Sequence, residues 1–178
     1  MGINKISWND DYYYNHSNKI DQLSIAFYIT PLINALIRMG TIQDKTLLFE
    51  AFIECWDSEK YETEDEFYER VAKNCINAKN RQKTQKDKAT NLLDIQIQNN
   101  CLENDKVLIL TGDELDVPTT ITGLCAMGMV EKYKRPVMLG RVNGTCHLKG
   151  SIRGKDNSDL KDFRKFLLDS GYMDYVEG

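Results

Sequence analysis

The chain has 178 residues, with 27 acidic against 23 basic side chains, a formal charge of -4 and 42% hydrophobic residues. This composition is typical of a folded globular protein with one medium domain or two small ones, and it excludes an intrinsically disordered chain. The sequence shows no apolar block of the signal-peptide kind and no apolar run as long as a membrane span, so we expect a cytoplasmic protein without a membrane partner.

The cysteines and histidines predict neither a disulfide framework nor a metal centre. The five cysteines are spread along the chain without a C-x-x-C pair, and the only histidines are His16 and His147. A zinc site or a Cys–His catalytic pair needs these residues in clusters. We therefore expect reduced, mostly buried cysteines, and neither catalytic residues nor metal ligands in this chain.

Positive charge is concentrated in two stretches of this acidic chain. Residues 132–155 contain seven Lys and Arg and no acidic residue, and residues 79–88 contain five cations against Asp87. Local clustering of this kind can attract an anionic ligand despite a negative net charge. A solvated face whose acidic neighbours are brought in by folding explains the pattern equally well.

The first sixty residues predict helices after an extended lead-in. The apolar segment 23–39 contains Pro31, so we expect one element to end there and a helix to follow the proline. Residues 44–56 carry apolar side chains at helical spacing and predict a second helix.

The middle of the chain predicts a connector. Thr63 and Glu66 form a capping-box signature for a helix that begins near Glu64. Helix-forming residues then continue to position 98, while the apolar stripe is missing over 77–88. The pattern predicts one long helix with a solvated middle, occupying most of residues 61–100.

Residues 101–178 change to alternating strand and helix patterns. We expect a strand over 107–111, a helix over 120–133, a strand over 136–140, a hairpin over 141–149 that turns at Asn143-Gly144, and an amphipathic helix over 158–170. The predicted fold class is α/β, with a small mixed-sheet C-terminal module preceded by a long connector helix and N-terminal helices.

The motif from Lys149 to Gly154 has the residue types of a phosphate-binding turn. Gly150 allows close approach of the backbone, Ser151 donates a hydroxyl, and Arg153 can bind a phosphate through two hydrogen bonds. An ordinary surface turn with an incidental arginine explains the motif at least as well when it is taken alone.

Two further segments carry candidate binding groups. Residues 116–120 place hydroxyls before a helix, which makes either an anion site or an ordinary N-cap. The small residues Gly123, Ala126 and Gly128 of that helix favour close packing over ligand contact. Asn34 and Arg38 lie one helical turn apart on an apolar segment, and they face a site or cap the backbone.

Several stretches resemble, in order, the C-terminal half of bacterial RecJ, an exonuclease specific for single-stranded DNA in the DHH phosphoesterase superfamily. Residues 26–35 with Arg38-Met39-Gly40 are similar to the family segment Ala-Phe-x-x-x-Pro-x-x-Asn-Ala-x-x-Arg-x-Gly, and Asn80-Arg81-Gln82 loosely resembles part of its interdomain helix. Residues 121–126, residues 130–137 and Lys149-Gly150-Ser151-Ile152-Arg153 resemble its DHH-associated domain. The matches cover roughly residues 24–155.

The resemblance implies a nucleic-acid-binding fragment of a 5′-to-3′ exonuclease that acts in DNA repair and recombination. Residues 1–60 would be the end of the catalytic DHH domain or interdomain helices, 61–100 the connector, and 101–178 the DHH-associated domain. The implied phosphate and nucleic-acid contacts are Lys149, Gly150, Ser151 and Arg153, with Asn34 and Arg38 from the other side. Single-stranded DNA and the catalytic domain of the same polypeptide are the implied partners.

The departures from the family pattern are informative. The Asp-His-His motif is absent, so the manganese or magnesium centre implied for the full-length protein lies outside this chain and the fragment binds without cutting. The Gly-Gly-His-x-x-Ala motif is also missing. Val117-Pro118-Thr119 replaces His-Pro-Gly, and Gly154 replaces a serine. A phage-borne relative with a different substrate preference is compatible with these changes.

Two alternatives remain open on the sequence. One is a relative that degrades oligoribonucleotides or cyclic dinucleotides, whose associated domain carries a similar Gly-Ser-x-Arg turn. The other is a non-enzymatic interaction module built around the long helix. The salt dependence of binding distinguishes the interaction module from a nucleic-acid-binding protein, because phosphate contacts weaken steeply with ionic strength and apolar helix packing does not.

Overall fold

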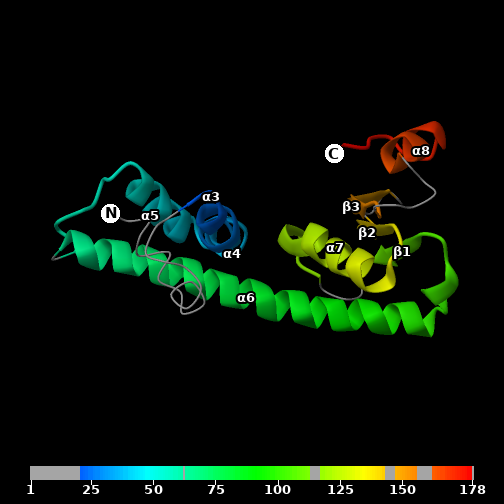
Figure 1. Ribbon diagram of the computed structural model, residues 1–178, viewed down its shortest axis with the longest axis horizontal. Helices are drawn as coiled ribbons and strands as arrows, with labels where there is room; N and C mark the ends of the chain where they lie inside the picture. The colour runs from blue at the N-terminus through cyan, green and yellow to red at the C-terminus, as the bar shows by residue number, and fades with distance from the viewer. Residues whose placement is uncertain (1–20, 62, 113–116, 143–146, 156–161, 178) are drawn as a thin grey trace. The chain divides into compact units, whose positions relative to one another are not determined.

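The computed structural model describes residues 21–61, 63–112, 117–142, 147–155 and 162–177. They divide into two compact units, one reaching to Gln85 and the other starting at Lys86. Helix α6 (Glu64–Asn99) contributes residues to both units, so the division falls inside the helix (Figure 1). The predicted fold class is confirmed: the chain combines N-terminal helices, a long helix and a small mixed sheet.

The N-terminal unit begins with one uninterrupted helical segment. Helix α3 (Gln22–Ser24), a π-helical turn (Ile25–Ile29) and α4 (Thr30–Met39) follow one another directly. Pro31 lies in the first turn of α4 directly after the π-helical turn, so the bond that its missing N–H cannot make falls where π-helical hydrogen bonding changes to α-helical. The predicted break at Pro31 is therefore wrong.

The continuity of this segment also contradicts the expectation that no apolar run in the chain is as long as a membrane span. The helix from Gln22 to Met39 is long and apolar enough to cross a membrane by length and composition. Within this helix 28% of the residues are buried, and Ile29, Leu32 and Leu36 belong to the apolar cluster of this unit.

Helix α5 (Ile42–Phe52) starts with a complete capping box. Thr41 Oγ1 accepts a hydrogen bond from the Asp44 N–H at 3.1 Å, and Asp44 Oδ2 accepts from the Thr41 N–H at 2.9 Å. The other oxygen of Asp44 accepts from Asn74 Nδ2 of α6 at 3.0 Å. One carboxylate thus fixes both the start of α5 and its position against α6. The helix predicted over 44–56 is present but ends at Phe52.

The core of the N-terminal unit forms where α4, α5 and the first half of α6 meet. Phe67 is fully buried, and its ring packs edge to face against Tyr61 and Tyr68 at centroid distances of 5.2 and 5.3 Å. The thiol of Cys75 is enclosed in the same cluster, and burial together with the nearby Asp44 carboxylate raises its pKa to about 11. Such a thiol is unreactive at neutral pH.

The long helix matches its predicted extent, and its start is capped as expected: the Glu66 N–H donates to Thr63 Oγ1 at 3.1 Å. Most of residues 77–88 are exposed or half-exposed as predicted, but Ala78 and Gln82 are buried. Gln82 is only 5% exposed and continues the buried stripe between the two apolar halves of the helix. Glutamine counts as a solvent-facing residue in a hydrophobicity pattern, so the burial of Gln82 could not be predicted from that pattern. The buried stripe consists of Val71, Cys75, Ala78, Gln82, Ala89, Leu93 and Ile97.

The C-terminal unit is built on a three-stranded sheet in the order β1-β2-β3. Strands β1 (Leu108–Thr111) and β2 (Val137–Val142) are parallel, and β3 (Leu148–Arg153) pairs with β2 antiparallel. The predicted hairpin is confirmed as β2 and β3. Its expected turn at Asn143-Gly144 lies outside the described residues.

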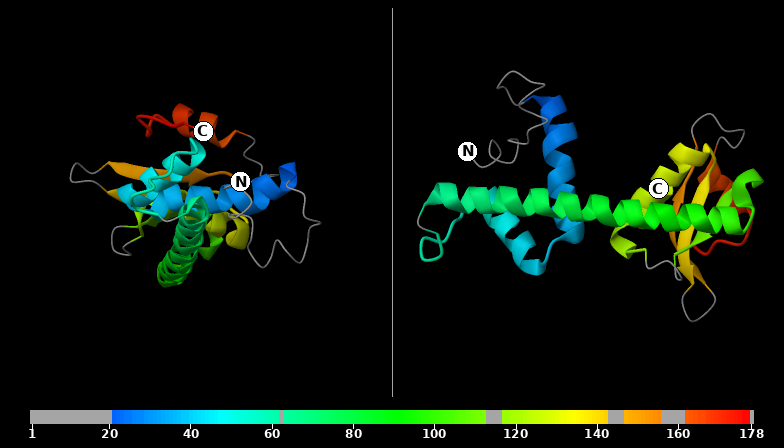
Figure 2. Two further views of the ribbon diagram at one scale, coloured as in Figure 1. Left: turned by 90° about the vertical axis from the view of Figure 1, so that its left-hand side faces the viewer. Right: turned by 90° about the horizontal axis from the view of Figure 1, so that it is seen from below.

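Helix α7 (Thr122–Tyr133) connects β1 to β2 after a 3-10 turn at Thr119–Ile121, and it packs against β2 and β3. In Figures 1 and 2 the sheet lies between α7 and α8 (Phe163–Asp169). The helix predicted over 158–170 is thus present from Phe163, and residues 158–161 lie outside the described part.

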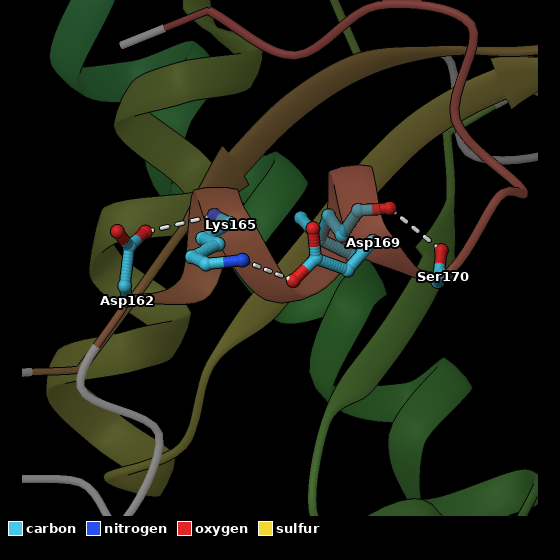
Figure 3. Close-up of polar contacts among 5 residues, drawn as sticks. Asp162, Lys165, Asp169 and Ser170 are labelled. Atoms are coloured by element: carbon cyan, nitrogen blue, oxygen red, sulfur yellow. Dashed lines mark hydrogen bonds and ion pairs between the residues drawn. The ribbon is translucent and has the colours of Figure 1, made fainter.

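Helix α8 is held by local polar contacts (Figure 3). Asp162 Oδ1 accepts from the Lys165 N–H at 2.8 Å and caps the helix, and the Lys165 ammonium pairs with Asp169 at 2.5 Å one turn later. At the C-terminal end, the Ser170 hydroxyl donates to the Leu167 carbonyl at 2.6 Å, while the Leu167 side chain is buried. These contacts define a short amphipathic helix with a single buried anchor.

The second half of α6 is tied to the sheet and to α7 by polar side chains. The amide of Gln96 donates to Thr111 Oγ1 at 3.1 Å and accepts from the Thr111 N–H at 3.3 Å, which satisfies the end of β1. Asp94 accepts from the Tyr133 hydroxyl at 2.9 Å and pairs with Lys132. Burial and this acceptor raise the pKa of Tyr133 to about 12, so its hydroxyl remains a donor.

The expectation of mostly buried cysteines is only half right. Cys75 and Cys125 are buried, whereas Cys55 and Cys101 are exposed; all four are free thiols. Burial raises the pKa of Cys125 as it does that of Cys75. The fifth cysteine, Cys146, lies outside the described residues.

The capping box predicts an asymmetry between two exposed threonines of the same helix region. Thr41→Ala removes the N-cap of α5 and should lower the free energy of unfolding by about 1 kcal/mol. Thr46→Ala is the matched control, because the Thr46 hydroxyl bonds only the Ile42 carbonyl of its own helix. Urea unfolding followed by circular dichroism measures both, and equal effects would contradict a capping role for Thr41.

Candidate functional site

The register of β2 and β3 assigns the motif residues to one face of the sheet. Arg153 pairs with Val137, Ser151 with Leu139, and Lys149 with Arg141. Directly opposed residues of an antiparallel ladder project on the same side, and alternate residues share a face. Ser151, Arg153, Lys149 and Arg141 therefore belong to the face that also carries the fully buried side chains of β2.

This face is the one covered by α7, and the contact is made at a glycine. A Cβ atom placed on Gly123 would lie 2.9 Å from Arg153 Nη2 and 3.4 Å from Ser151 Oγ. The guanidinium and the hydroxyl of the motif thus lie directly over the first turn of α7. The sequence-based reading of Gly123 as a helix-packing residue misses this role. Only the fold, which brings β3 beside the start of α7, places Gly123 at the motif.

The first turn of α7 is suited to a negative charge. Its N-cap is Ile121, whose side chain accepts no hydrogen bond, and the Thr122 hydroxyl donates to the carbonyls of Pro118 and Thr119 at 3.3 and 3.2 Å. Helix N-termini carry partial positive charge and free N–H groups. A guanidinium at the same place adds a full positive charge, so the arrangement attracts an anion. Asp116, the first residue of the predicted hydroxyl-rich segment, lies outside the described residues.

The basic stretch 132–155 separates into structural and unpaired cations. Lys132 pairs with Asp94, and Arg135 donates to the carbonyls of Glu103 and Asp105. Arg153 donates through Nη1 to the Ile152 carbonyl at 2.7 Å. None of the described carboxylates forms an ion pair with Arg141, Lys149 or Arg153. Folding therefore engages Lys132 with a carboxylate and Arg135 with main-chain carbonyls, and it pairs none of the described carboxylates with Arg141, Lys149 or Arg153.

Gly150 has a packing role that the motif does not reveal. A Cβ atom at Gly150 would lie 2.1 Å from the Leu139 carbonyl oxygen, and one at Gly140, its partner in the ladder, would lie 2.6 Å from Leu148 Cγ. The two glycines allow β2 and β3 to approach at this point. This close approach accounts for Gly150 without a ligand.

Asn34 and Arg38 belong to the N-terminal unit, whereas the other predicted contacts belong to the C-terminal unit. Both are exposed on α4 one turn apart. The helix ends immediately afterwards at Gly40, where a Cβ atom would lie 2.6 Å from the Leu36 carbonyl oxygen. The Arg-x-Gly part of this segment therefore combines an exposed cation with a sterically required glycine.

The described residues contain no group of three or more His, Cys, Asp or Glu side chains that could hold a metal ion. The polar groups of the candidate site are a hydroxyl, ammonium and guanidinium groups and the N–H groups of a helix start. These are donors that bind and orient an anion.

Comparison with known proteins adds independent information. No family model matches the chain. Over 162 residues it is 36% identical to the "Putative SPbeta prophage-derived single-strand DNA-specific exonuclease YorK" of Bacillus subtilis and to the "Putative single-strand DNA-specific exonuclease yorK" of Bacillus phage SPbeta. The matched region is 85% of this chain but 28% of each relative, so the chain spans little more than a quarter of their length. The chain is therefore similar to part of proteins that are named for degradation of single-stranded DNA.

The packing role of Gly150 predicts a stability effect that its neighbour lacks. Gly150→Ala forces a methyl group against backbone atoms and should cost roughly 1–3 kcal/mol of unfolding free energy. Gly154→Ala is the control, because its Cβ would lie 3.7 Å from Phe163 Cβ, an ordinary contact. Thermal and urea unfolding measure both variants. A Gly150→Ala chain of unchanged stability that binds anions less well would instead make Gly150 a direct ligand.

Proposed function

We propose that this chain is the nucleic-acid-binding part of a RecJ-like, single-strand DNA-specific exonuclease. The observation that carries the proposal is the convergence of Ser151 and Arg153 on the uncapped first turn of α7, with no described carboxylate paired to the arginine. The similarity to proteins named as single-strand DNA-specific exonucleases supports a DNA strand as the source of the anion.

In this proposal the C-terminal unit is the DHH-associated domain, and it holds the 5′-phosphate of the strand. Arg153 donates two hydrogen bonds to the phosphate, Ser151 donates a third, and the N–H groups at the start of α7 complete the site. Such contacts position a strand without reading its sequence. Arg38 and Asn34 of the N-terminal unit contact the backbone of the same strand.

Hydrolysis is assigned to a DHH domain of the same polypeptide that binds manganese or magnesium and digests the strand from its 5′ end in the cytoplasm. The greater length of the curated relatives leaves room for such a domain. Exposed apolar side chains on α3 to α5 offer it a surface, since Phe27, Ile42 and Phe49 are 70%, 79% and 62% exposed. Apolar patches of this kind are typical of surfaces that pack against another domain.

The 5′-phosphate assignment predicts a preference that depends on Arg153. A short single strand with a 5′-phosphate should bind more tightly than the same strand with a 5′-hydroxyl. Arg153→Ala should abolish the difference and weaken binding of the phosphorylated strand roughly ten- to a hundredfold, the value of a charge-assisted contact. Fluorescence anisotropy measures the affinities, with circular dichroism to confirm folding. Equal binding of both strands, unchanged by the substitution, would refute the assignment.

The contact at Gly123 predicts a second effect on the same measurement. Gly123→Ala places a methyl group where the Arg153 guanidinium lies and should remove the 5′-phosphate preference while the chain stays folded. Gly128→Ala is the matched control on the same helix, because its Cβ would lie 3.5 Å from Lys86 Cε and disturbs nothing. If Gly123→Ala and Gly128→Ala both keep the 5′-phosphate preference, that preference does not depend on the packing of the Arg153 guanidinium against α7.

Ionic strength separates this proposal from an interaction module. Binding through phosphates should weaken steeply as salt rises, in proportion to the number of phosphates contacted. An oligoribonucleotide of the same length is the competitor that tests the other alternative. Tighter binding of the RNA than of the DNA would favour the oligoribonuclease reading.

A further inference from the structure

A second pair of cations lies beside the Ser151–Arg153 site and forms no ion pair with any residue that the structure describes. Arg141 on β2 and Lys149 on β3 are directly opposed in the antiparallel ladder. Opposed side chains of this kind are roughly 5 Å apart at Cβ, and like charges in such a pair repel. None of the carboxylates in the described part of the chain forms an ion pair with either one.

Arg141 carries a further sign of a missing partner. Its Nε atom is buried and has no hydrogen-bond partner among the described residues. A buried donor without an acceptor costs free energy, and in proteins it commonly marks the place of an ion or water. Lys149, in contrast, is exposed, so an incoming anion can reach the pair from solvent.

The position of the pair relates it to the first site. Lys149 and Ser151 are two residues apart on one strand, which is a separation of roughly 6.6 Å along the same face. Arg141 stands at the carboxyl end of β2, the end of a parallel strand pair at which ligands of α/β sheets characteristically bind. Successive phosphates of an extended single strand have a similar spacing, and a strand held at Ser151 and Arg153 would bring its next phosphate to the pair.

We infer that Arg141 and Lys149 form a second anion subsite, which binds the first internucleotide phosphodiester after the 5′ end. This inference rests on the proposed function and deepens it. The phosphodiester accepts from the Lys149 ammonium and from the Arg141 guanidinium, and its negative charge removes the repulsion between the two cations. The subsite therefore recognises a linkage, where the Ser151–Arg153 site recognises a chain end.

The test combines a change in the strand with a change in the protein. Three 5′-phosphorylated thymidine strands are compared by anisotropy: the natural strand, one with a neutral methylphosphonate at the first linkage, and one with it at the last linkage. For the protein without substitutions, a neutral first linkage in the strand should weaken binding about tenfold, and a neutral last linkage should have little effect.

The variant Arg141→Gln/Lys149→Gln should bind the natural strand about tenfold more weakly and should no longer distinguish the first-linkage methylphosphonate. Arg141→Lys/Lys149→Arg keeps both positive charges and should retain most of the discrimination between the strands. This control would show that the glutamine variant loses discrimination because it lacks the charges, and not because its fold is disturbed. Lys106→Gln is the control for the loss of one exposed cation, and it should leave the discrimination intact.

The outcomes separate the two proposals. If the glutamine variant still loses about tenfold on first-linkage neutralisation, the phosphodiester does not bind this pair and the inference is wrong, while a preserved preference for a 5′-phosphate keeps the proposed function. If the 5′-phosphate preference is absent but the linkage effect depends on Arg141 and Lys149, the chain-end assignment fails and the subsite stands. A chain that binds no strand overturns both.

Discussion

The register between β2 and β3 is the constraint on which the candidate site depends. Gly140 and Gly150 are paired, and each lacks the Cβ atom that would collide with the neighbouring strand. This register aligns Ser151 with the buried Leu139 and so directs the motif side chains toward α7. A slip by one residue would turn Lys149, Ser151 and Arg153 to the opposite face of the sheet. The glycine pair therefore acts on binding through the strand geometry and needs no contact with the ligand.

The site also requires α7 to start at a fixed place, and polar contacts from the second half of α6 help to provide this. Gln96 closes the hydrogen bonds at the end of β1, and Asp94 holds Tyr133 and Lys132 at the end of α7. The helix is thus anchored at its C-terminal end, away from its first turn. That turn is left without a side-chain cap, which is a small cost in stability at the place where a ligand would supply the missing acceptor.

Sequence patterns predicted the elements of this fold well and the contacts of the site poorly. Alternation and helical periodicity located the strands, α7 and the extent of α6 because these depend on local spacing. The failures at Pro31 and Gln82 have physical causes: proline is tolerated in a first helical turn, and a long polar side chain can occupy a buried stripe position. Gly123 and Arg141 were not singled out as binding residues, since their importance arises from strand pairing and from the approach of β3 to α7. Neither is visible in a linear pattern.

An acidic chain with a cationic site illustrates why local geometry outweighs net charge. Folding neutralises or engages the cations at the start of the basic stretch, Lys132 and Arg135, in contacts that hold the C-terminal unit together. It leaves Arg141, Lys149 and Arg153 on one face of two adjacent strands, next to the positive end of a helix. Arg141 and Lys149 are directly opposed at a separation shorter than the Debye length of about 8 Å, so their charges act together, whereas acidic groups farther away on the surface are screened by salt. The acidic remainder then disfavours indiscriminate contact with DNA, so that an anion is attracted mainly to the sheet face that carries the three cations.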